Sequence, residues 1–243
     1  MNRQIWAQGI LVLTIAFAAS PFLTDGFGGF TKDQFPVQLD HWPAQPAGWA
    51  FSIWGVIYAW LIISAAFGVW RRANWEYWQV ARPTLALSLG IGVFWIAAAN
   101  AAPLVATGMI LIMAIAAIYA MLRSGTHDPW TLSGPIGLYA GWLTAASGVA
   151  VAVDLSGYGI LGGQTAALIA LSLVLMVGLG IQALRPALYT YPAAIVWALI
   201  GVIAANFSAA HWPSAALAAL GIIAFAYRTW ALNRRDLAAP AII

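Results

Sequence analysis

The sequence predicts an all-α membrane protein, a polytopic bundle of about eight transmembrane helices. Three observations carry this prediction: the composition, the spacing of the apolar runs and the distribution of the arginines. Of 243 residues, 63% are hydrophobic and only 7% are charged, whereas a soluble domain carries about 25% charged residues. The chain has too little charge to cover a water-exposed surface, so the lipid bilayer is its expected solvent and partner.

Eight apolar runs approach the ~20 helical residues that cross the hydrocarbon core of a bilayer. They are Ile5–Phe22, Gly48–Trp70, Thr84–Leu104, Thr107–Leu122, Ile136–Val153, Gln164–Leu184, Leu188–Asn206 and Pro213–Trp230. Only two residues separate the third run from the fourth, so these helices are expected to form a tight hairpin. The first run also fits a signal peptide, but Pro21 stands at the cleavage position, and we expect a retained helix.

The basic residues give an independent test of this span count. If the amino terminus lies in the cytoplasm, nine of the ten Lys and Arg residues fall on the cytoplasmic side. These nine are Arg3, Arg71, Arg72, Arg82, Arg123, Arg185, Arg228, Arg234 and Arg235. Only Lys32 falls outside, as the positive-inside rule predicts. We therefore expect a multi-pass protein of the cell membrane with both termini cytoplasmic.

Several classes of function are disfavoured by what the sequence lacks. Without cysteine there are no disulfides, thiolate metal sites, iron–sulfur clusters or covalent haem attachment. The small net charge does not indicate nucleic-acid binding. No ionisable residue lies in the middle of an apolar run, whereas ion pumps generally place such groups there. No metal site and no acid–base pair is visible, so an enzymatic activity is uncertain and is the least expected class.

The second apolar run carries aromatic residues at helical spacing. Phe51, Trp54 and Tyr58 share one helical face by their i, i+3, i+7 spacing, and Trp49 and Trp60 lie near another. These rings could simply pack in the core and at the membrane interface. Alternatively, one face could line a cavity for a flat apolar ligand, because aromatic faces stack on such ligands without any charge.

This run also carries a family resemblance. The segment Pro46-Ala47-Gly48-Trp49-Ala50-Phe51, followed by Trp54 and Tyr58, resembles the second helix of the TspO/MBR family (tryptophan-rich sensory protein, translocator protein), whose members carry Pro-Pro-Gly-Trp-x-Phe followed by Trp and Tyr.

Two further segments resemble the same family in part. In the fifth run, Tyr139, Trp142 and Ala146 match the motif Pro-Tyr-x-x-Trp-x-x-Phe-Ala-x-x-Leu-Asn. At three other positions the chain departs from this motif, with Leu138, Ala145 and Ala150 in place of proline, phenylalanine and asparagine. Asn100 corresponds to the asparagine of Leu-Asn-x-x-Trp, with Pro103 at the tryptophan position. A lone intramembrane asparagine can also serve as an interhelical hydrogen bond.

The resemblance implies a TspO-like five-helix core at residues 1–155 and an additional three-helix region at 156–243. It implies a membrane protein that binds a porphyrin-type or other flat apolar ligand for sensing, reception or transport, with no required cofactor and with porphyrin or haem as the ligand. The implied ligand-binding residues are Trp49, Phe51, Trp54, Tyr58, Asn100, Tyr139 and Trp142. The connection Asp25–Trp42, with His41 and Trp42, is the implied lid.

The length and composition of the long connection Leu23–Ala47 also favour a lid, independently of the resemblance. It is longer than most structureless loops and contains several aromatic residues, although a solvated linker remains the plain alternative. His41 could ligate a haem iron or simply be solvated.

Two other functions stay open. One is a transporter for a neutral or amphipathic solute, for which a faint repeat between spans two to four and six to eight is the only support. The other is a structural or accessory subunit of a membrane complex, or a homodimer, in which the tryptophans contact partner chains.

Overall fold

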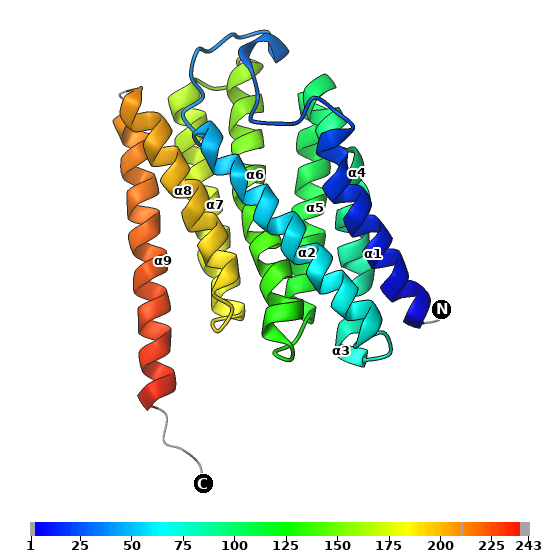
Figure 1. Ribbon diagram of the computed structural model, residues 1–243. Helices are drawn as coiled ribbons and strands as arrows, with labels where there is room; N and C mark the ends of the chain where they lie inside the picture. Colours follow the sequence, from blue (N-terminus) through cyan, green and yellow to red (C-terminus); the bar gives the residue numbers. More distant parts are fainter. Residues whose placement is uncertain (1–2, 210, 239–243) are drawn as a thin grey trace.

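The structure, a computed structural model, describes residues 3–209 and 211–238, which form a bundle of helices (Figure 1). The helices are α1 (Arg3–Ala19), α2 (Ile53–Trp70), α3 (Glu76–Gln79), α4 (Arg82–Ala101), α5 (Pro103–Arg123), α6 (Gly134–Gly157), α7 (Gly163–Leu184), α8 (Thr190–Ser208) and α9 (Trp212–Ala238). All except the short α3 are, with their flanking turns, long and apolar enough to cross a membrane. The described residues therefore contain eight candidate spans, and the predicted all-α membrane bundle is confirmed.

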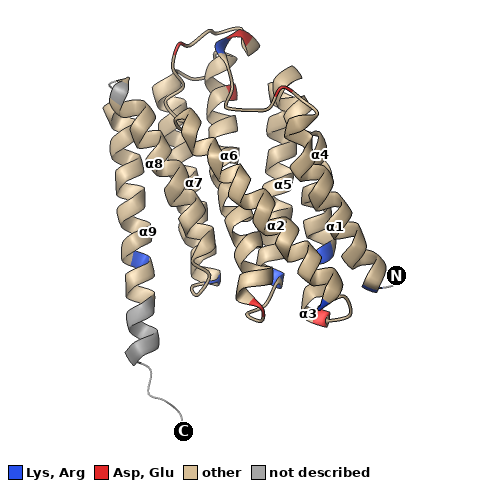
Figure 2. Cartoon of the chain, viewed as in Figure 1, with Lys and Arg blue, Asp and Glu red and all other residues tan. Residues whose placement is uncertain are grey.

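The two ends of the bundle differ in charge (Figure 2). One end, where α1 begins and α2 ends, carries most of the described arginines, and we call it the arginine end. The opposite end carries the connection 23–47 with Lys32, and we call it the loop end. The clustering of basic residues at one end agrees with the predicted topology. The assignment of that end to the cytoplasm stays a prediction.

Glycines on α6 set how closely its neighbours pack. A Cβ atom on Gly141 would lie 2.2 Å from the carbonyl oxygen of Tyr191 on α8, and one on Gly148 would lie 2.2 Å from Val174 on α7. A side chain at Gly141 would require α8 to shift, and one at Gly148 would require Val174 to move. These two glycines therefore permit the close approach of two different helices.

The hairpin between α4 and α5 is as tight as expected, because α4 ends at Ala101 and α5 begins at Pro103. Proline is tolerated in this first helical turn, where its missing N–H has no intrahelical partner. The indole Nε1 of Trp95 donates a hydrogen bond to the Ala106 carbonyl oxygen across the hairpin (3.0 Å). This bond fixes the Trp95 ring between the helices.

Helix α8 packs against the turn that starts α2. Trp197 Nε1 donates to the Ala50 carbonyl oxygen (2.8 Å), and the Ala47 N–H donates to the Gly201 carbonyl oxygen (3.0 Å). A Cβ atom on Gly201 would lie 2.7 Å from Pro46. The carboxy-terminal region therefore holds the segment that carries the family-like motif.

Two ionisable side chains lie deeper than the sequence suggests. The apolar runs place Arg82 before the third span and Asp154 after the fifth. In the structure α4 begins at Arg82 and α6 continues to Gly157, so both residues are helical and buried, with 3% and 6% of their surface exposed. The helices extend beyond the apolar runs because hydrogen bonds and packing, as well as hydropathy, set helix ends.

Candidate functional site

An aromatic cavity lies between α2, α4, α5, α6 and α8, beneath the connection 23–47. Six aromatic side chains line it: Phe27, Phe30, Phe51, Trp54, Trp95 and Trp142. Small residues of α6 complete the wall, and Ala198 contributes from α8. The loop, the second to fifth spans and α8 of the carboxy-terminal region all contribute to one cavity.

The rings of this cavity pack edge to face. Phe27 and Trp95 lie 4.9 Å apart between centroids at 76°, and Trp54 and Trp142 lie 6.1 Å apart at 83°. The free volume left among the side chains is about 20 Å³, which is room for about one water molecule. The structure therefore shows the cavity closed, with its own aromatic rings filling the space.

One of the lining residues has a buried hydrogen-bond donor without a partner. The Trp95 indole N–H is used within the hairpin, but Trp142 Nε1 is buried and has no hydrogen-bond partner. Only 1% of the Trp142 surface is exposed. A buried donor without a partner costs about 1–3 kcal/mol, so a ligand that brings a hydrogen-bond acceptor would be favoured here.

The side chain of Gln45 holds the loop over the cavity. The Phe30 N–H donates to Gln45 Oε1 (2.8 Å), and Gln45 Nε2 donates to the Phe30 carbonyl oxygen (3.3 Å). Gly29 has φ of +120°, a conformation that glycine adopts readily, and a Cβ atom there would lie 2.7 Å from the Gln45 side chain. We call this pair of hydrogen bonds the Gln45 latch.

A second, polar cavity of about 490 Å³ lies on the other side of the latch, within the connection 23–47. It is lined by Lys32, Asp40 and His41 among others, and it shares Phe30, Gln45 and Pro46 with the aromatic cavity. These three residues form the partition between a polar vestibule and an apolar interior. The loop contains both polar and aromatic residues, because its polar side lines the vestibule and its aromatic side lines the aromatic cavity.

Further contacts fasten the same loop to the helices. Asn206 Nδ2 donates to the Pro43 carbonyl oxygen (2.9 Å), and the Val37 N–H donates to the Gly157 carbonyl oxygen (2.9 Å). Gln34 Nε2 donates to the Ala99 carbonyl oxygen (2.7 Å). The loop is thus an ordered cover fixed to α4, α6 and α8.

The predicted lid residues occupy different layers of this cover. Trp42 is buried and packs on Phe35 (5.2 Å between centroids). His41 lines the vestibule, stacks on His211 at 5.0 Å and 17°, and places Nε2 3.2 Å from Asn206 Oδ1. Its imidazole contacts α8 and the start of α9 rather than the aromatic cavity.

Five of the seven predicted ligand-binding residues lie in or directly behind the cavity wall. Phe51, Trp54 and Trp142 line the aromatic cavity together. Tyr58 and Tyr139 form a layer behind it: Tyr58 stacks on Trp54 at 5.3 Å, and the Tyr139 ring lies 6.4 Å from Trp54.

The other two predicted residues lie outside the cavity wall. Trp49 is 48% exposed and packs on Trp197. Asn100 is exposed, and its Nδ2 donates to the Gly26 carbonyl oxygen (3.1 Å), so it anchors the loop. Ligand contact by any of the seven residues stays a prediction.

Sequence reasoning did not select several cavity residues. In the sequence, Phe27 and Phe30 are aromatic residues of the long connection, and Trp95 is one tryptophan within the third apolar run. Gln45 and Ala198 gave no signal, because an amide in a loop and an alanine in an apolar run are both common. Their roles depend on how the loop and α8 fold back over α2.

At the arginine end, the Asp128 carboxylate is fully engaged in hydrogen bonds. Asp128 accepts two hydrogen bonds from Arg72, with Nε–Oδ2 at 2.6 Å, and further bonds from Tyr77 and Trp78. The Arg72 guanidinium is the main cause that lowers the pKa of the Asp128 carboxyl to about 2. These bonds connect the α2–α3 segment to the turn before α6.

A known protein family matches nearly the whole chain. No curated protein and no solved structure matches it. The family model described as TSPO-like protein matches residues 4–230, which includes α7, α8 and most of α9 as well as the five spans that carry the motifs. The chain therefore belongs to the family of TSPO-like proteins.

Proposed function

We propose that this membrane protein binds a flat apolar ligand of the tetrapyrrole type in the aromatic cavity, for sensing or for transport. The observation that carries the proposal is the cavity wall itself, which has six aromatic rings, one of which, Trp142, has a buried indole N–H without a partner. Rings in this arrangement can separate and stack on a planar ligand. The Trp142 N–H would then donate to a polar group on that ligand.

Binding requires the loop to move. A free volume of about 20 Å³ is far below the ~300 Å³ or more of an ordinary small-molecule site. The vestibule lies directly over the partition of Phe30, Gln45 and Pro46, so entry from the loop end would begin with the opening of the Gln45 latch. The polar vestibule would retain the polar edge of the ligand while its rings enter the cavity.

Transport right through the bundle has less support. A second cavity of about 20 Å³ near the arginine end is lined mainly by residues of α1, α2 and α4, including the buried Arg82. It shares no lining residue with the aromatic cavity. We accordingly favour binding and sensing, or loading from one side, over a continuous pathway.

The test is quenching of tryptophan fluorescence by protoporphyrin IX, with the full-length protein purified in a neutral detergent. We expect saturable quenching in the micromolar range that the double variant Trp54→Leu, Trp142→Leu loses. The matched control is Trp70→Leu, Trp130→Leu, which removes the same number of indoles from exposed positions. The proposal is wrong if both double variants bind as the unmodified protein does, or if quenching never saturates.

A further inference from the structure

A second apolar recess lies on another face of α6, between α5, α6 and α7. It encloses about 220 Å³ and is lined by Leu111 and Ile115 of α5, Gly148 and Val151 of α6, and Leu173 and Val177 of α7, among others. Four of these side chains, those of Leu111, Ile115, Leu173 and Val177, are exposed on candidate membrane spans. The recess therefore opens toward lipid, and we call it the lipid-facing groove.

Two polar residues continue the walls of this groove by one helical turn toward the loop end. On α5, Thr107 stands four residues before the lining residue Leu111. On α6, Asp154 stands three residues after the lining residue Val151. Residues three and four apart share a helical face. Figure 2 shows the acidic position near the loop end of α6.

Both polar side chains are buried and unsatisfied. Asp154 is 6% exposed and Thr107 is 7% exposed, and neither carboxyl oxygen nor the Thr107 hydroxyl has a hydrogen-bond partner. The Thr107 hydroxyl lies beside the carboxyl, but without hydrogen-bond geometry. Such groups are rare in native proteins, because each costs free energy that a partner would recover.

The other hydroxyls of the groove behave differently. Thr144 Oγ1 donates to the Ala140 carbonyl oxygen (2.8 Å), and Ser147 Oγ donates to the Ile110 carbonyl oxygen (3.3 Å). The unmet hydrogen-bonding capacity is thus concentrated at one end of an otherwise apolar recess. That pattern fits an elongated ligand with an apolar chain and one polar head.

We propose that the lipid-facing groove binds a single-chain amphiphile with an ammonium head group, with the head against Asp154 and Thr107 and the chain along the groove. An ammonium carries three N–H donors and no acceptor, and both the carboxylate and the hydroxyl can accept. Its positive charge also offsets the cost of burying a carboxylate. The site is separate from the proposed aromatic site, since the two cavities share no lining residue.

The groove can be tested in full-length protein reconstituted in phosphatidylcholine nanodiscs, by following thermal unfolding while tetradecylamine is added. We expect the amine to raise the unfolding midpoint in a saturable way, and Asp154→Asn to weaken the apparent affinity at least tenfold. Tetradecanol and tetradecanoate, which have the same chain, should stabilise much less. Ala114→Phe, which fills the groove, should abolish the effect.

Two controls keep this result distinct from the aromatic cavity. Ser156→Ala removes a hydroxyl on the same helix that bonds only its own backbone, and it should bind tetradecylamine normally. The Trp54→Leu, Trp142→Leu variant should also keep the amine effect. Equal stabilisation of unmodified protein and Asp154→Asn would overturn the groove proposal, and so would equal stabilisation by all three head groups.

Discussion

Two buried ionisable side chains of the bundle, Arg82 near the arginine end and Asp154 near the loop end, differ in their hydrogen bonding. The guanidinium of Arg82 donates to the carbonyl oxygens of Gly68, Arg72 and Ala73 and to Gln79 Oε1. The Asp154 carboxyl and the neighbouring Thr107 hydroxyl have no hydrogen-bond partner. Arg82 therefore has the contacts of a structural residue, whereas Asp154 keeps free acceptors at the end of the lipid-facing groove.

This difference teaches where function is expected. A polar group with all its bonds made contributes to stability, whereas an unsatisfied group lowers stability and persists where it serves another purpose. The loop end also carries the cover over the aromatic cavity. We therefore expect substitution of Arg82 to change folding, and substitution of Asp154 or of the cover over the aromatic cavity to change binding.

The largest effect is expected at Arg82. Arg82→Leu removes the donor from the buried carbonyl oxygens of Gly68 and Ala73, and each buried unsatisfied group costs about 1–3 kcal/mol. The free energy of unfolding should fall by roughly 3 kcal/mol, measured as a lower unfolding midpoint in detergent. Arg71→Leu, which changes a nearby exposed arginine, should change the midpoint little. Equal losses in the two variants would show that the hydrogen bonds of Arg82 are not the source of its effect on stability.

A smaller, pH-dependent effect is expected at Asp128. Its folded-state pKa is about 2, held down mainly by Arg72, and an unfolded aspartate has a pKa of about 3.9. The ionised form is thus favoured by folding. Its stabilising contribution is present above pH ~4 and is lost as the pH falls toward ~2.

The measurement is the unfolding midpoint of the unmodified protein and of Asp128→Asn across this range. Near pH 7 the variant should be less stable by about 1–2 kcal/mol. The difference should shrink as the pH drops below ~4, because the unmodified carboxyl becomes neutral as well. A difference that stays constant down to pH 2 would show that the Arg72–Asp128 pair is not its source.

Much of the helical framework of the molecule was predictable, because hydropathy acts locally along a helix. The eight spans and the α4–α5 hairpin both follow from the sequence. The predicted face of Phe51 and Trp54 also proves to be the face that meets the cavity. Each of these features depends on residues a few positions apart.

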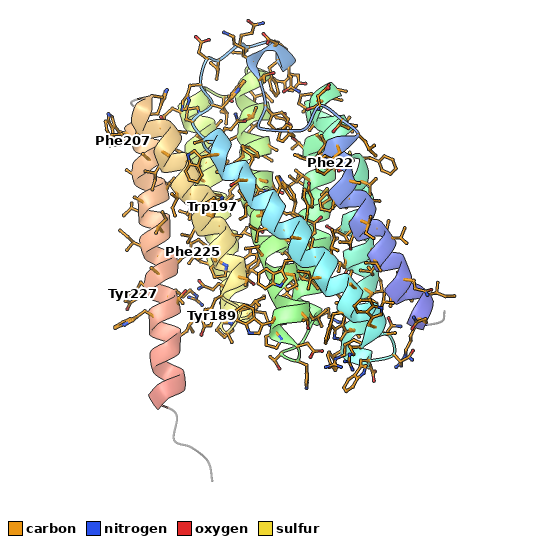
Figure 3. All side chains as sticks on the ribbon, in the orientation of Figure 1. Phe22, Tyr189, Trp197, Phe207, Phe225 and Tyr227 are labelled. Carbon is orange, nitrogen blue, oxygen red and sulfur yellow. The ribbon has the colours of Figure 1, made fainter. Side chains whose placement is uncertain are left out.

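The site was harder to predict, because its parts come together only in three dimensions. Whether Gln45 points to water or back to Phe30 depends on a turn fifteen residues earlier. Asp154 seemed to follow a span because its neighbours end the apolar run, yet the helix continues and buries it. Ala198 reaches the cavity only because α8 packs on the start of α2. Figure 3 shows side chains filling the space between the helices. The order of residues along the sequence does not reveal this packing.

The smallest effect on stability, and the sharpest test of the loop end, is expected at Gln45. Gln45→Leu removes both bonds of the latch, whereas Gln45→Glu keeps an acceptor for the Phe30 N–H and loses only the donor to the Phe30 carbonyl oxygen. Because the loop is fastened elsewhere by Asn206 and Gln34, the unfolding free energy should fall by only about 1 kcal/mol. The Phe30 amide should nevertheless exchange its hydrogen much faster in Gln45→Leu.

Hydrogen exchange at the Phe30 amide can distinguish whether the Gln45 hydrogen bonds or the packing of the loop keeps the cover closed. The measurement needs no ligand. If the latch holds the cover closed, exchange at Phe30 should be fastest in Gln45→Leu, intermediate in Gln45→Glu and slowest in the unmodified protein, while amides of α4 and α5 stay unchanged. Lys32→Met, which breaks the surface ion pair with Asp40, serves as the loop control and should leave Phe30 protected. Faster exchange in Lys32→Met than in Gln45→Leu would mean that the rim of the vestibule, and not the partition, keeps the cavity closed.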